Sequence, residues 1–457
     1  MPRTRPDLWP APLAVALVAA LAAPLATCSD DGGDPEPDDG GSDADADADA
    51  DTDTDTDADT DTGEDDTPPE LPAACSISVL HQPVSGDGDG RWPAIVRGGD
   101  HALITWAYDE QEGEAEDWDV QVASFDLEAA PIVGEAAEPI NPSALSEKPA
   151  MAHRDGVFGV VWLDARWDPA CDTADLDACR RELAFLELDP TGQPVDSAEP
   201  VQITLDEDVN GRPSIAATSS GYLVAWNDTA GSSGTAQVVA VGADGTPGAV
   251  HLLGEQGAAA PMRRVAVAAL GEQAIVAWLG IDQTNIYTQE IGPDGAPLGE
   301  PRELGDMTPC LRPRLAAGDD RILLTWTKRP VEDYDVYSIA LDGSGAPIGD
   351  EQRITWTDRD VLYATPVWDG ERFAVAWLGD RADGADECAV DSCNDQVFIT
   401  ALDAAGAPRA RAVRVSDNPN DSSVADITWH PGGYTAVFEV RRNMRQQVFY
   451  GTILCDD

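Results

Sequence analysis

The segment Gly221-Tyr222-Leu223-Val224-Ala225-Trp226 is a short run of β-forming residues that ends on a tryptophan, and runs of this kind recur along the chain. Seven such runs end on an aromatic residue, at Trp106, Trp162, Trp226, Trp278, Trp326, Trp377 and Phe438. Successive ends are 56, 64, 52, 48, 51 and 61 residues apart. A repeat of this length, made of strands, predicts a propeller of four-stranded blades.

One complete unit runs from residue 212 to residue 253. Its first three expected strands are residues 212–216, 221–226 and 237–241. The turn Asp244-Gly245 follows, and residues 251–253 are the fourth expected strand. Residues 312–355 repeat the same order. Continuous apolar runs such as residues 274–278 are typical of strands buried on both faces. We therefore expect the tryptophans to pack between neighbouring blades rather than to stack on a ligand.

The repeats predict an all-β, seven-bladed propeller whose last blade is closed by the N-terminal strand. Blade seven supplies only three expected strands, at residues 425–429, 434–440 and 447–454. A surplus strand, residues 76–80, precedes the first inner strand. We expect this strand to complete blade seven, with a Cys75–Cys455 disulfide in place of the missing hairpin turn.

These units resemble a repeat of secreted bacterial β-propeller proteins, in which Pro-x-Val/Ile-Ala is followed by Gly-x-Tyr-x-Val-x-Trp and by a Gly-x-Pro turn. The pattern covers most of residues 75–455. It departs at Phe438, and at Val265, where blade four lacks the proline. The resemblance implies a propeller and brings no established chemistry with it.

The first 28 residues have the order of an export signal, with Arg3 and Arg5 before an apolar stretch at residues 11–26. The stretch is too short, and too soon followed by acidic residues, for a membrane-spanning helix. Leu25-Ala26-Thr27-Cys28 resembles a bacterial lipobox, in which the cysteine is acylated and becomes the mature N-terminus. Ordinary signal cleavage with an incidental Cys28 is the alternative. We expect lipidation, because a lone cysteine ends the apolar stretch.

Residues 29–70 form a low-complexity segment in which aspartate alternates with alanine or threonine between residues 43 and 62. The segment contains no lysine or arginine. Like charges at every second residue repel one another and no apolar core can form, so we expect a disordered linker that carries the propeller of residues 71–457. Calcium loops need a glycine-centred turn and a bidentate glutamate at fixed spacing, which this pattern lacks.

The acidity extends into the propeller itself. Of 85 acidic residues, 20 lie in the linker and one is Asp7, while Arg3 and Arg5 are two of the 28 basic residues. The 64 acids and 26 bases that remain give residues 71–457 a charge of −38. Such a charge disfavours nucleic acid and anionic membrane surfaces as partners and suits a monomeric exterior domain. We expect an exported lipoprotein of the bacterial outer membrane or cell surface, or alternatively a periplasmic or secreted protein, that meets the membrane only through its lipid.

The other cysteines agree with an oxidising compartment. Cys171 and Cys179 lie in one expected loop, and Cys388 and Cys393 lie in another. Pairing within each loop, Cys171–Cys179 and Cys388–Cys393, is the simplest connectivity, although six cysteines allow fifteen. A zinc site is the alternative, but the five histidines lie outside these loops. Cys310 is left as a buried thiol or an intermolecular partner.

Loops that follow second strands share one face of a propeller with the starts of the inner strands, and long loops often carry binding sites. The longest expected loops, residues 107–118, 163–180 and 378–395, are all acidic. Acids there that could coordinate calcium are Asp109, Glu110, Asp172, Asp175, Asp177, Asp383 and Asp386. Without a ligand-spacing motif we expect solvated charges rather than a metal or another cofactor.

A cation recurs near the start of the inner strands, fourteen residues before the tryptophan. Lys148, Arg212, Arg264 and Arg312 hold that position, and Arg91 lies beside it in blade one. These side chains would ring the mouth of the central channel, where a positive potential would attract an anionic ligand such as a carboxylated sugar. The alternative, which we favour, is that each pairs with acidic residues of its own or a neighbouring blade.

Familiar catalytic motifs do not occur in the sequence. It has no Ser-x-Asp-x-Gly-x-Thr-Trp box, Gly-x-Ser-x-Gly elbow, His-Glu-x-x-His pair or phosphate-binding loop. Asp164, Asp228 and Asp380 follow tryptophan-ended strands and are candidates for a glycosidase pair. We expect a surface-tethered binding or scaffolding propeller for an unidentified extracellular protein or glycan. The alternative is a polysaccharide-acting hydrolase or lyase with its site at the channel mouth.

Replacing Cys28 by serine tests the anchor. If Cys28 carries the lipid, the Cys28→Ser protein should move from the membrane fraction to the soluble fraction, because the acyl chains supply its membrane affinity. Cell fractionation with immunoblotting of both proteins measures this. Unchanged membrane association of the variant would contradict lipidation at Cys28.

Overall fold

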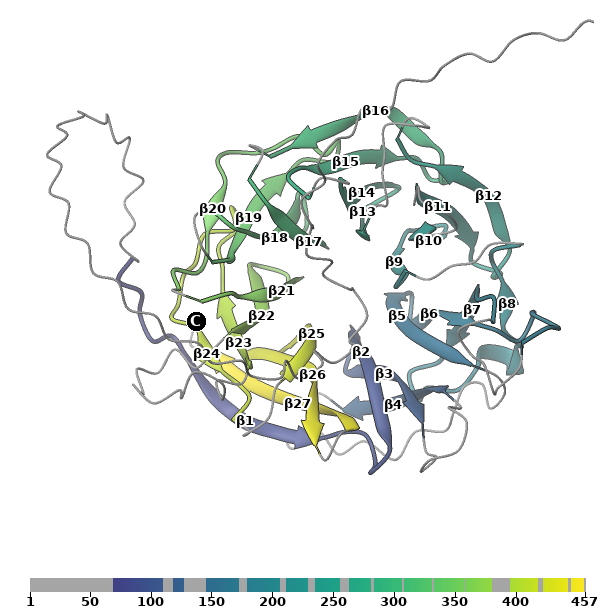
Figure 1. Cartoon of the computed structure of the whole chain (residues 1–457), viewed down its shortest axis with the longest axis horizontal. Helices are drawn as coiled ribbons and strands as arrows, with labels where there is room; N and C mark the ends of the chain where they lie inside the picture. Colours follow the sequence, from purple (N-terminus) through teal and green to yellow (C-terminus); the bar gives the residue numbers. More distant parts are fainter. Residues whose placement is uncertain are drawn as a thin grey trace, which may run out of the picture. The chain divides into compact units, whose positions relative to one another are not determined.

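The repeats fold into a ring of β-sheets around one axis (Figure 1). The computed structural model describes residues 69–109, 118–126, 145–171, 179–205, 211–228, 235–254, 263–280, 283–305, 308–330, 333–357, 359–379, 395–417, 422–442 and 445–455. The expected signal peptide, residues 1–28 with Cys28, and all but the last two residues of the linker lie outside these ranges. Within the described ranges, no helix is long and apolar enough to cross a membrane.

Each blade is an antiparallel sheet whose strands follow one another from the axis outwards. The inner strands are β2 (Asp89–Gly98), β5 (Ser146–Arg154), β9 (Ser214–Ala217), β13 (Arg263–Leu270), β17 (Cys310–Ala317), β21 (Leu362–Trp368) and β25 (Ser422–His430). The second strands are β3 (His101–Asp109), β6 (Val157–Asp164), β10 (Gly221–Asp228), β14 (Gln273–Leu279), β18 (Ile322–Lys328), β22 (Phe373–Gly379) and β26 (Gly433–Arg442). The third strands are β4 (Asp119–Asp126), β7 (Glu182–Leu188), β11 (Thr235–Gly242), β15 (Ile286–Ile291), β19 (Asp335–Leu341), β23 (Gln396–Ala401) and β27 (Arg445–Cys455).

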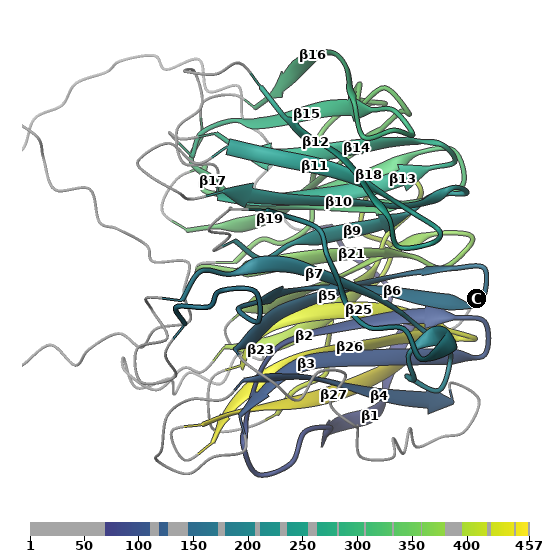
Figure 2. The ribbon, with the colours of Figure 1, turned by 90° about the vertical axis from the view of Figure 1, so that its right-hand side faces the viewer.

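The outer strands differ widely in length. They are β8 (Val201–Gln202), which follows the short 3-10 turn η2 (Val195–Ser197), then β12 (Pro247–Leu252), β16 (Pro297–Leu304), β20 (Gln352–Arg353), β24 (Val413–Arg414) and β1 (Cys75–Pro83). Three strands of blade one are described, because residues 127–144, where its outer strand is expected, lie outside the described ranges. Seen from the edge, the strands run along the axis of the ring (Figure 2). The fold is the predicted seven-bladed β-propeller.

The tryptophan series packs between blades, as predicted. None of the six tryptophans is more than 6% exposed, and Phe438 is fully buried. Trp226 of blade three, for example, lies in one cluster with Leu163 and Phe185 of blade two. Truncating a buried aromatic residue of this size to alanine costs about 3–5 kcal/mol, so each interface contributes substantially to the stability of the ring.

The turns between third and fourth strands fasten neighbouring blades together. In blade six, the Asp403 carboxylate accepts hydrogen bonds from the backbone N–H groups of Ala405 and Ala407, at 2.9 and 3.0 Å. Gly406, with a φ of 91°, lies against blade five, where the Ser338 hydroxyl donates to its carbonyl oxygen at 2.9 Å. A β-carbon at residue 406 would lie 2.5 Å from that hydroxyl, so both the contact and the backbone angle require glycine. This turn fixes the path of the chain into β24.

The ring closes in blade seven, where β1 pairs with β27 as the outermost strand. The register runs from Cys75 opposite Cys455 to Pro83 opposite Phe449. Cys75 and Cys455 form the predicted disulfide, which joins residues 380 positions apart. Hydrogen bonds between the first and last strands and one covalent bond therefore hold the two ends of the domain together.

The two disulfides that the structure describes allow a matched test of closure. We expect the double variant Cys75→Ser/Cys455→Ser to melt several degrees below the wild type, for a loss of about 2–4 kcal/mol. The control, Cys171→Ser/Cys179→Ser, should lose less, because that bond joins residues only 8 positions apart and constrains the unfolded chain less. Calorimetry measures both. Equal losses, or peptide mapping that pairs Cys75 with another cysteine, would contradict the closure argument.

Candidate functional site

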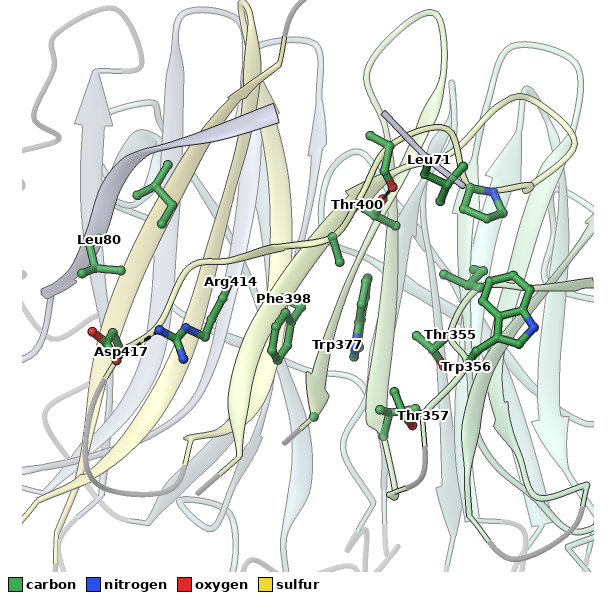
Figure 3. A pocket seen from close by; sticks show the side chains of 17 residues that line it. Leu71, Leu80, Thr355, Trp356, Thr357, Trp377, Phe398, Thr400, Arg414 and Asp417 are labelled. Atoms are coloured by element: carbon green, nitrogen blue, oxygen red, sulfur yellow. Dashed lines mark hydrogen bonds and ion pairs between the residues drawn. The ribbon is translucent and has the colours of Figure 1, made fainter. Parts of the chain in front are cut away.

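A groove of about 550 Å³ lies on the outer flank of blade six. Its floor is formed by Trp377 of β22 and by Phe398 and Thr400 of β23 (Figure 3). One wall comes from blade five, from the residues that follow β20, and the other comes from residues 408–417 and from β1 of blade seven. Leu71, in the segment that leads into β1, lines one end.

The lengths of the outer strands explain why the groove forms here. β20 and β24 have two residues each, so the outer parts of blades five and six cover little of the sheets behind them. β1, the outermost strand of blade seven, has nine residues and contacts β24 of blade six. Apolar side chains therefore line a hollow that a full-length outer strand would have filled. Ile77 and Leu80 of β1 line it and remain 48% and 37% exposed.

Aromatic rings and a buried carboxylate shape the groove. The Trp377 and Phe398 rings stack with their centroids 6.0 Å apart. The Asp335 carboxylate, buried in β19, accepts hydrogen bonds from the Thr355 hydroxyl at 2.6 Å and from Arg353 at 2.7 Å. These bonds fix the segment that carries Trp356, whose indole ring lies at the rim of the groove (Figure 3). The site thus has a rigid aromatic floor and a partly exposed tryptophan at its edge.

The two charged side chains of the groove neutralise each other. Arg414 and Asp417 lie at the end opposite Leu71 and form an ion pair at 3.4 Å. The Thr400 hydroxyl donates to the carbonyl oxygen of Ala410 at 2.6 Å and is already satisfied. A ligand with apolar parts and little net charge therefore matches this lining.

The sequence interpretation did not identify this site, because it placed binding on the loop face around the axis. One signal was available in the segment Gln352-Arg353-Ile354-Thr355-Trp356. It reads as an outer strand, yet its tryptophan lies outside the repeat series and has no blade interface in which to pack.

Arg212, one of the predicted basic ring, makes contacts among several blades near the axis. Its guanidinium donates to the carbonyl oxygens of Pro93 in blade one, at 2.8 Å, and Pro149 in blade two, at 3.3 Å. Its charge also acts on two carboxyl groups of blade seven, Asp426 and Glu439. Arg212 thus holds the inner strands of neighbouring blades together.

The other predicted cations are also engaged within the protein, as far as the structure describes them. Lys148 lies over the Trp92 ring of blade one, with its nitrogen 5.6 Å from the centroid. Arg312 lies over the Tyr363 ring of blade six at 3.8 Å. Arg91 pairs with Asp89 at 2.9 Å, and the side chain of Arg264 lies outside the description. These contacts agree with the structural alternative, while anion binding by the ring stays a prediction.

Two carboxyl groups of blade seven, the buried Glu439 and the half-buried Asp426, accept hydrogen bonds from backbone N–H groups of blade one. Glu439 accepts hydrogen bonds from the N–H of Trp92 and from the Ser423 hydroxyl, at 2.5 and 2.6 Å. Asp426 accepts from the N–H of Ile95 at 3.1 Å. Desolvation raises the pKa of both carboxyl groups above its usual range, despite the nearby arginines. Both groups connect the last blade to the first.

Of the candidate glycosidase acids, only Asp164 has a side chain that the structure describes. Asp164 is buried and accepts hydrogen bonds from the Trp162 indole at 2.8 Å and from the Arg166 side chain at 3.0 Å. Burial raises the pKa of Asp164, and Arg166 opposes that shift. The side chain of Asp228 and all of Asp380 lie outside the described residues.

Some residues of the predicted metal and disulfide sites are among those that the structure describes. Cys171 and Cys179 form the predicted loop disulfide, and Cys310 is buried. The Cys388–Cys393 pair lies outside the described residues. Among the calcium candidates only Asp109 is described, and the described part of the chain has no group of three His, Cys, Asp or Glu side chains arranged to hold a metal ion.

The engagement of Arg212 and Arg312 predicts a structural role for both. Replacing both by glutamine should lower the melting temperature by several degrees, because contacts between blades near the axis are lost. A thermal-shift screen of sugar acids, phosphate and sulfate against both proteins measures this. If the two arginines bind an anion instead, it should raise the melting temperature of the wild type alone, and the shift should weaken with salt.

No family model and no curated protein sequence matches the chain. Solved structures with similarity include a protein of unknown function from Dyadobacter fermentans, at 9% identity and a TM-score of 0.48 over 84% of this chain and 99% of that one. The polysaccharide lyase Uly1 has 9% identity and a TM-score of 0.44, over 80% of this chain and 90% of its own. Trypanosoma rangeli sialidase has 10% identity and a TM-score of 0.40, over 84% of this chain and 60% of its own length. At these values the likenesses carry no argument about the substrate or reaction of this chain.

Proposed function

We propose that this chain is a binding propeller, exported and anchored to the bacterial surface through Cys28, with its binding site in the groove of blade six. The single observation that carries the proposal is the groove itself, with its stacked aromatic floor, the exposed edge of Trp356 and a balanced ion pair. Its volume of about 550 Å³ falls in the usual range for ligand sites. The ligand belongs to an extracellular protein or a glycan.

The hydrogen bonds of three described carboxyl groups support binding rather than catalysis by these groups. A hydrolase or lyase acting on polysaccharide at the channel mouth would need a carboxyl group able to reach its substrate. Asp164, Asp426 and Glu439 instead accept hydrogen bonds from tryptophan, arginine or backbone groups of the protein itself. These bonds support a structural role for all three acids.

Matched leucine variants test the site. The wild type and a control, Leu298→Asp, should capture the same ligands from a glycan array and from extracts of secreted proteins. Leu298 is 42% exposed on the outer strand of blade four, and Leu80, in the groove, is 37% exposed. Leu80→Asp and Trp356→Ala should each weaken capture at least about tenfold, as expected when an anchor residue is lost.

Two results would contradict the proposal. One is capture that survives both Leu80→Asp and Trp356→Ala. The other is chain cleavage of a polysaccharide that is abolished by substituting Asp426 or Glu439. Melting curves of every variant separate loss of binding from loss of folding.

A further inference from the structure

The segment before β1, residues 69–74, occupies one end of the groove, and we call it the strap. Its side chain Leu71 is half-buried in the groove, while the neighbours Glu70 and Pro72 are exposed. Leu71 is therefore the one side chain of the strap that lines the groove, at the point where the chain continues towards the linker.

Backbone contacts hold the strap against blade six through its carbonyl groups. The N–H of Arg411 donates to the carbonyl oxygen of Pro72 at 2.9 Å, and the Arg411 guanidinium donates to that of Leu71 at 3.0 Å. The strap sequence is Pro69-Glu70-Leu71-Pro72-Ala73-Ala74. Hydrogen bonds to two consecutive carbonyl oxygens bind a peptide backbone, and Leu71 adds one apolar side chain that lines the groove. The strap is thus bound as a short peptide segment would be.

We propose that the groove recognises an extended peptide segment of a partner protein that carries an apolar side chain in the place of Leu71, and that the strap is a built-in competitor for one end of the groove. This inference rests on the proposed function and names its partner class and its regulation. The groove continues from Leu71 past Trp377 and Phe398 to the Arg414–Asp417 pair (Figure 3). A partner segment that fills both ends gains contacts that the strap does not make, and it can displace the strap for that reason.

Competition by the strap should weaken the binding of a free peptide to the groove. A segment on the same chain competes at an effective concentration that reaches the millimolar range for short connections, so it weakens the apparent affinity of a free peptide. Removing the anchor of the strap removes this cost and tightens binding by the inverse of the fraction of molecules in which the groove is open.

The test titrates the full chain with a labelled peptide of residues 69–74, by fluorescence anisotropy. Leu71→Ala should bind this peptide at least about tenfold more tightly than the wild type does. The matched control Leu298→Ala should bind as the wild type does. Adding Trp356→Ala to Leu71→Ala should abolish the gain, because the peptide then loses the rim aromatic ring. Adding Arg411→Ala should reduce the gain, because the guanidinium donor to the leucine carbonyl oxygen is lost while the backbone N–H of residue 411 remains.

Two results would overturn the inference: equal affinity of the wild type and Leu71→Ala, including the absence of binding in both, or a gain that survives Trp356→Ala. The titration needs no natural partner, so its outcome is separate from that of the capture experiment. A chain that shows the tenfold gain but captures no protein or glycan contradicts the proposed function alone. A chain whose capture depends on Trp356, but whose affinity for the peptide ignores Leu71, contradicts the strap alone.

Discussion

Pairing between β1 and β27 turns seven similar sheets into a closed ring, and the rest of the structure depends on that pairing. A blade buries its apolar faces only against a blade on either side, so an open row of blades would leave two such faces in water. Here the first and last strands share one sheet, the Cys75–Cys455 bond joins them, and Asp426 and Glu439 bind the backbone of blade one. Closure is thus made by three different kinds of interaction at one junction.

Closure also creates the candidate site. Because β1 comes from the N-terminus, its length is independent of the repeat, and it extends beside a blade whose own outer strand has two residues. The mismatch leaves the flank of blade six open, with Trp377 and Phe398 at the bottom of the groove. The segment that leads into β1 then necessarily passes over that flank. Assembly of the ring and access to the groove are therefore linked through the same few residues.

The periodic features of this molecule could be predicted from its sequence, and the aperiodic ones could not. Blade number, the burial of the tryptophan series and the closing strand follow from a pattern that every blade repeats. The groove depends on the lengths of β20, β24 and β1, which no repeat specifies. The acceptors of Arg212 lie in blades one and two, and only the folded ring brings their carbonyl groups near it. The position of the cations was foreseeable, and their contacts with carbonyl groups and aromatic rings of neighbouring blades were not.

The bond between Cys75 and Cys455 has a further consequence for the resistance of the domain to proteases. It makes the propeller a covalent circle, so a protease that cuts any one exposed loop between these cysteines leaves a single connected molecule with both fragments still held in the ring. Loss of a blade then requires two cuts, or one cut together with reduction of the disulfide. A single cut in a long surface loop therefore does less damage to this domain than it would to a propeller without a disulfide between its ends.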